Sequence, residues 1–250
     1  MSLRLEERHK TEQDFHDRAA RHERSDFYTW GALSAADTYA YSRLDQLQGQ
    51  VVLDLGCGDG RNTLRFAQQA ALVHAVDLSG GMVEVTRRRV AAAGLQDRVI
   101  AHQMSAETLE FADQTFDAIF GHSVLHHTEI PRTRREIYRL LKPGGRAVFL
   151  EPLDHNPLLA LFRRLTPWRR TPTERPLCFA DVLMFAEPFS GFEHREFYLL
   201  ALAAFATVPL RNKRLFQATL GFLTSIDTLL LRRWPALGKH SWVIVMDLTR

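Results

Sequence analysis

From residue 51 onward, short apolar runs alternate with segments whose apolar residues recur at helical spacing. The apolar runs predict five strands, at Val51–Leu55, Leu72–Val76, Val99–Gln103, Phe116–Phe120 and Arg146–Leu150. The intervening segments predict helices at Arg61–Gln69, Gly81–Ala93 and Arg132–Leu141, the last closed by a Lys-Pro-Gly-Gly stop signal. Apolar strands that alternate with helices are typical of a parallel sheet covered on both faces.

The regular alternation ends near residue 152, where longer apolar segments with arginines begin. Amphipathic spacing predicts helices at Asn156–Leu165 and Phe179–Phe185. Further strands are predicted at Phe192–Tyr198 and His240–Leu248. Between these strands, Leu199–Gly238 is mostly apolar and helical, and an insertion of that length is typical of a lid or an oligomer surface.

Residues 6–47 are mostly polar with scattered aromatic side chains, and they predict two or three helices that flank the main fold. We therefore expect a Rossmann-like α/β fold: a seven-stranded, mostly parallel sheet with helices on both faces. We expect three parts: an N-terminal helical cap (1–50), a cofactor-binding core (51–152), and a C-terminal part (153–250) with the remaining strands and a lid inserted before the last one. A chain of 250 residues with 46% hydrophobic content can bury a full core.

The formal net charge of +3 is unevenly distributed. Residues 1–150 carry 19 basic and 20 acidic side chains, whereas residues 151–250 carry 13 basic and 9 acidic ones. The basic excess of the C-terminal part fits two interpretations, solvated helix faces or attraction to a membrane surface or an acidic partner.

The sequence favours a cytoplasmic location. The two cysteines, Cys57 and Cys178, make no disulfide framework. The N-terminal residues are charged and lack an apolar stretch, so we expect no signal peptide. The longest uncharged apolar run, Phe197–Leu210, has 14 residues, fewer than the ~20 that a membrane-spanning helix needs.

The stretch Val51–Gly60, VVLDLGCGDG, predicts a buried strand, a glycine-rich turn and a helix start. Glycine at positions 56 and 58 lets a ligand approach the backbone and tolerates the positive φ of such a turn. The helix that starts near Gly60 directs its free N–H groups toward that ligand. Asp77 follows the second strand, 21 residues after Gly56, where a carboxylate can accept hydrogen bonds from two ribose hydroxyls.

The spacing of the turn separates two classes of cofactor. Dinucleotide-binding enzymes carry G-x-G-x-x-G, with the pyrophosphate over the helix N-terminus. This chain has the form G-x-G-x-G, with small Cys57 inside the turn and Asp54 directly before it. A carboxylate beside the turn repels a pyrophosphate but suits a ligand that carries an amine.

Five segments, in order over Val51–Pro152, resemble the motifs of the class I S-adenosylmethionine-dependent methyltransferases. They are VLDLGCGDG, AVDLSGGMVEVTRRR, SAETLEF, TFDAIFGHSVLHH and LLKPGGRAVFLEP. The resemblance is greatest to the small-molecule subgroup that includes the ubiquinone and menaquinone C-methyltransferases. It implies S-adenosyl-L-methionine as the cofactor and methyl transfer as the activity. The chain departs from the family at Met104-Ser105, where an aspartate is frequent.

The resemblance also implies roles for individual residues. Gly56 and Gly58 would approach the methionine end of the cofactor, and Asp77 would hold the ribose. The remaining cofactor-binding candidates are Asp54, Cys57 and Gly60 around the turn, Leu78, Ser105, Ala106 and Glu107 around the adenine, and His122 beside the methionine part.

Methyl transfer from a sulfonium is a direct displacement, so the protein supplies alignment and, for some acceptors, a base. His126 and His127 follow the fourth strand at its carboxyl end, where ligands bind in such sheets. A histidine there could deprotonate a hydroxyl or an amine, and the resemblance favours His126 for this role; local packing is the alternative. His16 and Tyr28, in the N-terminal cap, are further candidates to face the substrate.

The adjacent histidines also raise the question of a metal. Zinc takes three or four ligands at defined spacing, and the sequence sets out no Cys or Glu partner beside this pair. We therefore expect no metal site.

Two arginine-containing apolar segments, Leu158–Arg170 and Leu229–Leu237, indicate either a packed cap or a lid that admits a lipid-like substrate, with peripheral membrane contact. We expect a small, hydrophobic or aromatic acceptor and no nucleic-acid partner, because no basic-aromatic groove is apparent. A protein or RNA methyltransferase and a non-catalytic cofactor-binding accessory protein are the alternatives, and an oligomer is compatible with the sequence.

Overall fold

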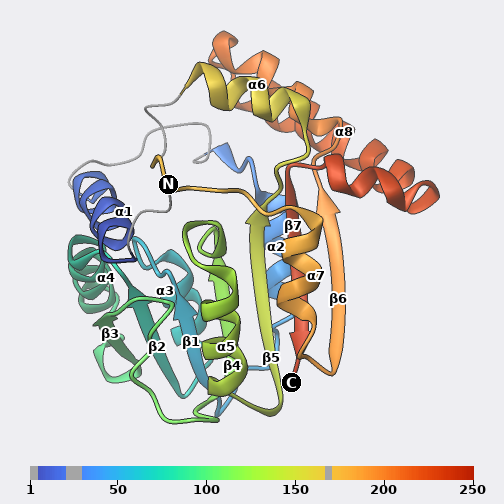
Figure 1. The fold of residues 1–250 in the computed structure, drawn as a ribbon. Coiled ribbons are helices and arrows are strands. Elements are labelled where there is room, and N and C mark those ends of the chain that lie inside the picture. The colour runs from blue at the N-terminus through green and yellow to red at the C-terminus, as the bar shows by residue number, and fades with distance from the viewer. Residues whose placement is uncertain (1–4, 21–29, 167–170) are drawn as a thin grey trace.

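The computed structural model describes residues 5–20, 30–166 and 171–250, which form a seven-stranded sheet with helices on both faces (Figure 1). The strands run in the order β3-β2-β1-β4-β5-β7-β6. Strands β1 to β5 pair in parallel, whereas β7 is antiparallel to both of its neighbours. The predicted seven-stranded, mostly parallel sheet is therefore confirmed. The strands are β1 (Val51–Leu55), β2 (Leu72–Asp77), β3 (Val99–Gln103), β4 (Phe116–His122), β5 (Leu141–Pro152), β6 (Gly191–Phe197) and β7 (Val243–Thr249).

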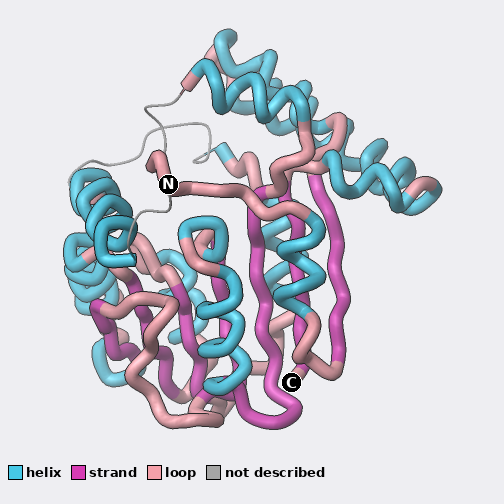
Figure 2. Tube along the Cα trace, in the orientation of Figure 1, coloured by secondary structure: helices cyan, strands magenta, loops and turns pink. Residues whose placement is uncertain are grey.

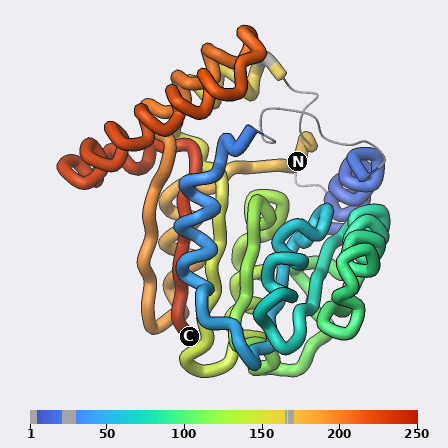
Figure 3. The backbone as a smooth tube through the Cα atoms, turned by 180° about the vertical axis from the view of Figure 1, so that it is seen from behind, coloured from blue at the N-terminus to red at the C-terminus, as the bar shows by residue number. Residues whose placement is uncertain are grey.

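Helices cover both faces of the sheet, as Figures 1 and 3 show from opposite sides, and an apolar cluster lies on each face. One face packs against α2 (Ser34–Ser42), α3 (Arg61–Ala67) and α4 (Gly80–Ala92). The other packs against α5 (Ile130–Leu140) and α7 (Phe179–Ala186). The central strands β1 and β4 are buried on both sides, which explains why their sequences read as continuous apolar runs rather than as alternating ones.

The N-terminal helix α1 (Leu5–Ala19) lies beside α4 (Figure 1). Only one of its residues, Glu12, is buried. Helix α1 is therefore attached to the sheet by polar contacts rather than by an apolar stripe.

The C-terminal helices lie beyond the carboxyl end of β5, as the tube in Figure 2 makes visible. They are α6 (Pro157–Leu165) and α8 (Lys213–Arg233), and two 3₁₀ segments, η5 (Ala201–Leu210) and η6 (Pro235–His240), flank α8. None of the helices in the described ranges is long and apolar enough to cross a membrane.

The predicted starts of strands β5 and β7 differ most from the structure. Strand β5 begins at Leu141, not at Arg146, because Leu141 pairs with Phe116 before a shift in register that accommodates Gly144 at φ +74°. The Lys-Pro-Gly-Gly sequence thus ends the helix but lies inside the strand. Strand β7 begins at Val243 rather than at His240, because η6 continues through His240.

Candidate functional site

The turn between β1 and α3 contains three glycines in the left-handed region, Gly56, Gly58 and Gly60. A Cβ atom at Gly56 would lie 2.8 Å from a methyl group of Val124, and one at Gly60 would lie 2.8 Å from the hydroxyl of Thr86. A Cβ at Gly58 would have no neighbour within 4 Å. The outer two glycines therefore permit close packing, whereas the space beside the Cα atom of Gly58 is open.

Asp77 lies at the carboxyl end of β2 and faces this turn. One carboxylate oxygen accepts a hydrogen bond from the Gly58 N–H at 2.8 Å, and the other accepts one from the Ser79 N–H at 2.9 Å. Burial raises the pKa of Asp77, and these two N–H groups partly offset the effect. The carboxylate is thus fixed in orientation between the turn and the start of α4, with Leu78 beside it in the chain.

Asp54 is buried at the end of β1. Its Oδ2 accepts a hydrogen bond from the Thr63 hydroxyl at 2.5 Å, while its Oδ1 has no hydrogen-bond partner. Burial raises the pKa of Asp54 to about 7, with a further contribution from the charge of Asp77. Two carboxylates beside one glycine turn favour a ligand that brings a positive charge.

The segment after β3 is covered by α1. The Glu107 carboxylate contacts the guanidinium of Arg8 and accepts a hydrogen bond from the Glu129 N–H at 3.0 Å. The Ser105 hydroxyl lies 3.2 Å from Nε2 of His9, also on α1, and accepts a hydrogen bond from the Glu107 N–H. Ala106 is half-buried between them. Helix α1 therefore covers the segment after β3, which the resemblance assigns to the adenine of the cofactor.

Two other predicted cofactor residues make specific contacts of their own. Nε2 of His122, at the end of β4, lies 3.1 Å from a carboxylate oxygen of Asp37 on α2. The thiol of Cys57 is buried 3.7 Å from the Thr86 hydroxyl, and burial raises its pKa well above the ordinary value. Cys57 therefore acts as a small packing residue and not as a reactive thiolate.

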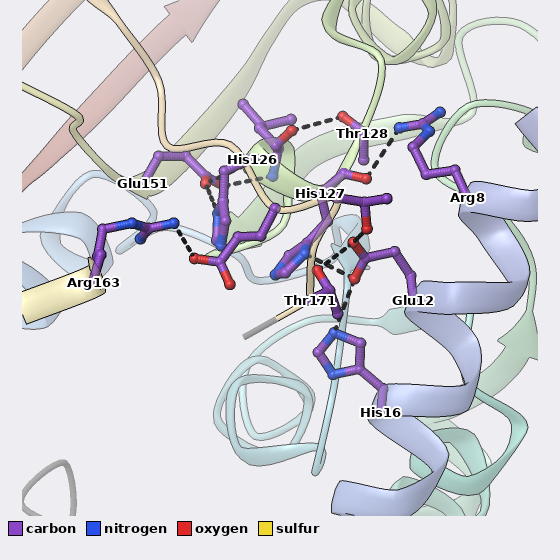
Figure 4. Close-up of polar contacts among 12 residues, drawn as sticks. Arg8, Glu12, His16, His126, His127, Thr128, Glu151, Arg163 and Thr171 are labelled. Atoms are coloured by element: carbon purple, nitrogen blue, oxygen red, sulfur yellow. Dashed lines mark hydrogen bonds and ion pairs between the residues drawn. The ribbon is translucent and has the colours of Figure 1, made fainter. Parts of the chain in front are cut away.

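His126 is buried in the turn after β4, where its Nδ1 lies 2.7 Å from Oε2 of Glu151 (Figure 4). The other oxygen of Glu151 accepts hydrogen bonds from the N–H groups of Val124 and Leu125, both at 2.8 Å. Burial lowers the pKa of His126, so the imidazole is neutral near pH 7. Glu151, at the end of β5, therefore holds the whole turn that follows β4.

His16 lies next to His127, with the two rings edge to face at a centroid distance of 5.3 Å. Both face Glu12, a residue that the sequence reasoning did not single out (Figure 4). Tyr28 lies outside the described residues. Arg8 and Glu151 were also missed; Glu12 stands four residues before His16, a helical i,i+4 relation that the sequence alone could have revealed.

Residues 52–145 match a family model described as a methyltransferase domain. The chain is 47% identical over 107 residues to the demethylmenaquinone methyltransferase of Symbiobacterium thermophilum, a match that covers 41% of this chain and 43% of that protein. It is 33% identical over 124 residues to the 2-phytyl-1,4-naphtoquinone methyltransferase of Trichormus variabilis, covering 48% and 53%. The matches thus span about half the length of these curated relatives.

A solved structure shares the fold over most of the chain. It is phosphoethanolamine N-methyltransferase 2 of Haemonchus contortus in complex with S-adenosyl-L-methionine, with a TM-score of 0.62 and 21% sequence identity. The similarity covers 85% of this chain and 52% of that one. It extends beyond the residues of the family match to most of the sheet and its helices.

Proposed function

We propose that this protein is a class I, S-adenosylmethionine-dependent methyltransferase that methylates a small hydrophobic acceptor. The match of residues 52–145 to a methyltransferase domain supports this proposal. The observation that carries the proposal is the arrangement of Asp54, Gly58 and Asp77 at the carboxyl edge of the sheet. Asp54 offers a buried oxygen without a partner, Gly58 open space beside its Cα atom, and Asp77 an oriented carboxylate.

These residues fit S-adenosylmethionine by charge and by hydrogen bonding. The free oxygen of Asp54 suits the ammonium group of the methionine part, which would relieve the cost of a buried, unpaired carboxylate. Each oxygen of Asp77 accepts one backbone N–H and keeps a second lone pair for a ribose hydroxyl. His122, Leu78, Ser105, Ala106 and Glu107 are the further residues that we assign to this site. When bound, the sulfonium supplies an electrophilic methyl group.

We assign His126 the role of a base for acceptors that must lose a proton. Glu151 accepts the proton on Nδ1 of His126, which leaves Nε2 with its lone pair. The test is a His126→Gln variant. We expect a lower kcat with an unchanged Kd for the cofactor; an unchanged kcat on every accepted substrate would refute a base at this position.

The proposed acceptor class follows from the surface of the C-terminal helices. Leu158, Leu161 and Phe162 on α6 and Phe222 and Leu229 on α8 are exposed, an unusual number of large apolar side chains for two neighbouring helices. Both helices carry arginines in their last turns. Apolar side chains beside arginines suit a lipid-like acceptor taken from an anionic membrane surface. The two relatives named above are methyltransferases of quinone-type compounds by name.

The acceptor class can be tested with a substrate panel. The full chain would be incubated with methyl-labelled S-adenosylmethionine and isoprenoid quinols, phenols, thiols and polar amines, and products would be identified by mass spectrometry. We expect turnover on the apolar members and none with an Asp77→Asn variant. Turnover on polar amines alone would refute the hydrophobic acceptor. Label in protein or RNA would select a macromolecular acceptor, and binding without turnover an accessory role.

Membrane contact can be tested separately by sedimentation with vesicles. We expect the full chain to bind vesicles that contain anionic lipid, and expect Phe222→Ser and Leu229→Ser on α8 to weaken that binding. Thr228→Ala, an exposed change on the same helix, is the matched control. Equal binding by all variants, or binding to none of the vesicles, would contradict peripheral contact through α8.

A further inference from the structure

Five ionisable side chains from distant parts of the sequence meet beside the turn that follows β4 (Figure 4). They fall into two overlapping groups that share His127. The first group is Glu12, His16 and His127, and the second is His126, His127 and Glu174. Within each group, the atoms that could bind a metal lie within 4.8 Å of one another.

The atoms of the first group converge on one point. Nδ1 of His127 lies 2.9 Å from Oε2 of Glu12, and Nε2 of His16 lies 3.7 Å from the same oxygen. Ligands of a tetrahedral zinc ion, with bonds of about 2.1 Å, stand about 3.4 Å apart. The observed separations bracket that value, so one ion can reach all three atoms with small adjustments.

The hydrogen bonding of Glu12 supports a ligand role. Its other oxygen, Oε1, accepts hydrogen bonds from the hydroxyls of Thr171 and Thr173, the former at 2.6 Å. Oε2 of Glu12 and Nδ1 of His127 are both buried and form an ion pair at 2.9 Å, and neither atom has another hydrogen-bond partner among the described residues. Supporting hydroxyls on one oxygen and a second oxygen directed at imidazoles are the usual surroundings of a metal-binding carboxylate.

The second group is less suited to a cation. Oε1 of Glu174 accepts a hydrogen bond from the guanidinium of Arg163 at 2.8 Å, which places a positive charge beside the group. Nδ1 of His126 is already paired with Glu151. The first group has no arginine on its carboxylate among the described residues, so it is the more favourable of the two.

We propose that Glu12, His16 and His127 bind a divalent transition metal ion of the zinc type. Two imidazole nitrogens and one carboxylate oxygen match the donors that zinc prefers and are less suited to calcium or magnesium, which take oxygen ligands. Three protein ligands leave at least one coordination position for another molecule. The ion joins α1 to the turn after β4. This site does not depend on the proposed methyl transfer.

The first experiment measures zinc binding to the full chain after treatment with a chelator. Calorimetric titration is expected to give one ion per chain. We expect each of the variants Glu12→Gln, His16→Gln and His127→Gln to bind zinc more than ~100-fold more weakly than the unmodified chain. A loss of ~100-fold is the most that replacing a residue which only supports a ligand usually causes. Asp14→Asn, an exposed change on the same helix, is the matched control and should bind as the unmodified chain does.

A second measurement guards against variants that bind poorly because they are misfolded. His16→Gln leaves the contacts of Glu12 with Thr171 and Thr173 in place, so its metal-free circular dichroism and Tm should match those of the unmodified chain. Addition of Co²⁺ should give intense visible bands of a four-coordinate site in the unmodified chain and not in His16→Gln.

Three results would overturn the proposal. The first is a chain that shows no saturable binding of zinc or cobalt. The second is a zinc affinity in both His16→Gln and His127→Gln that equals the affinity of the unmodified chain. The third is a loss of binding in His126→Gln and Glu174→Gln while His16→Gln binds normally, which would assign the ion to the second group.

Discussion

Glu151 is expected to be the residue whose replacement is most damaging to the turn after β4. Its carboxylate accepts the N–H groups of Val124 and Leu125, both at 2.8 Å, and lies 2.7 Å from Nδ1 of His126. The side chain is fully buried, so water cannot replace these bonds. A Glu151→Ala variant would leave four donors without this acceptor, because the His126 N–H also contacts the carboxylate, at 3.4 Å.

The magnitude follows from those contacts. Each unsatisfied buried donor costs about 1–3 kcal/mol, and single substitutions rarely cost more than about 5 kcal/mol in total. We expect Glu151→Ala to lower the free energy of unfolding by about 3–5 kcal/mol, or Tm by about 6–20 °C in a chain of this size. Glu151→Gln keeps one accepting oxygen and should lose about 1–3 kcal/mol.

The assay is urea unfolding followed by circular dichroism. Glu193→Ala is the matched control, because Glu193 is 68% exposed and its ion pair with Arg43 is worth ~1 kcal/mol or less. If Glu151→Ala unfolds within about 1 kcal/mol of Glu193→Ala, the carboxylate does not hold the turn and the reasoning from its contacts is wrong.

Two further predictions concern the glycine turn. The pKa of Asp54 is about 7 in the folded chain and near 3.8 in the unfolded chain, so the free energy of unfolding should fall as pH rises from about 4 to 7. Urea unfolding at several pH values should show a weaker dependence on pH for Asp54→Asn than for the unmodified chain. Gly60→Ala, whose Cβ would meet Thr86 at 2.8 Å, should lose about 2–4 kcal/mol in urea unfolding. Gly58→Ala should lower the free energy of unfolding by only about 1–2 kcal/mol, because of its positive φ, but should weaken S-adenosylmethionine binding in calorimetry. Equal losses of stability in Gly58→Ala and Gly60→Ala would contradict the different roles assigned to the two glycines.

The sequence was sufficient for the sheet and for the glycine turn because both depend on local patterns. A buried strand, a glycine turn and an acid after the next strand lie within 30 residues, and their periodicity changes where the structure changes. The start of β5 could not be predicted from a local pattern. Leu141 joins the sheet through its pairing with Phe116, a contact that no local pattern encodes.

The polar cluster around His127 could not be predicted for a related reason. Glu12 and Thr171 are 159 residues apart in the chain and meet only when α1 and the loop before α7 are both in place. Adjacent histidines were visible in the sequence, but their partners depend on tertiary structure. The same holds for Glu151, whose role is evident only when β5 lies beside β4.

The way in which α1 is attached has a consequence for the exchange of ligand at the proposed cofactor site. The only buried side chain of this helix is a carboxylate, and its contacts with the core are ion pairs and hydrogen bonds, such as that of Arg8 with Glu107. Such contacts weaken as salt screens them, whereas apolar packing does not. Helix α1 contacts the segment after β3 through His9 and Ser105. Because we assign that segment to the proposed cofactor site, we expect exchange of the cofactor to require release of α1. The dissociation rate of bound ligand should therefore increase with ionic strength, even if the chemical step does not.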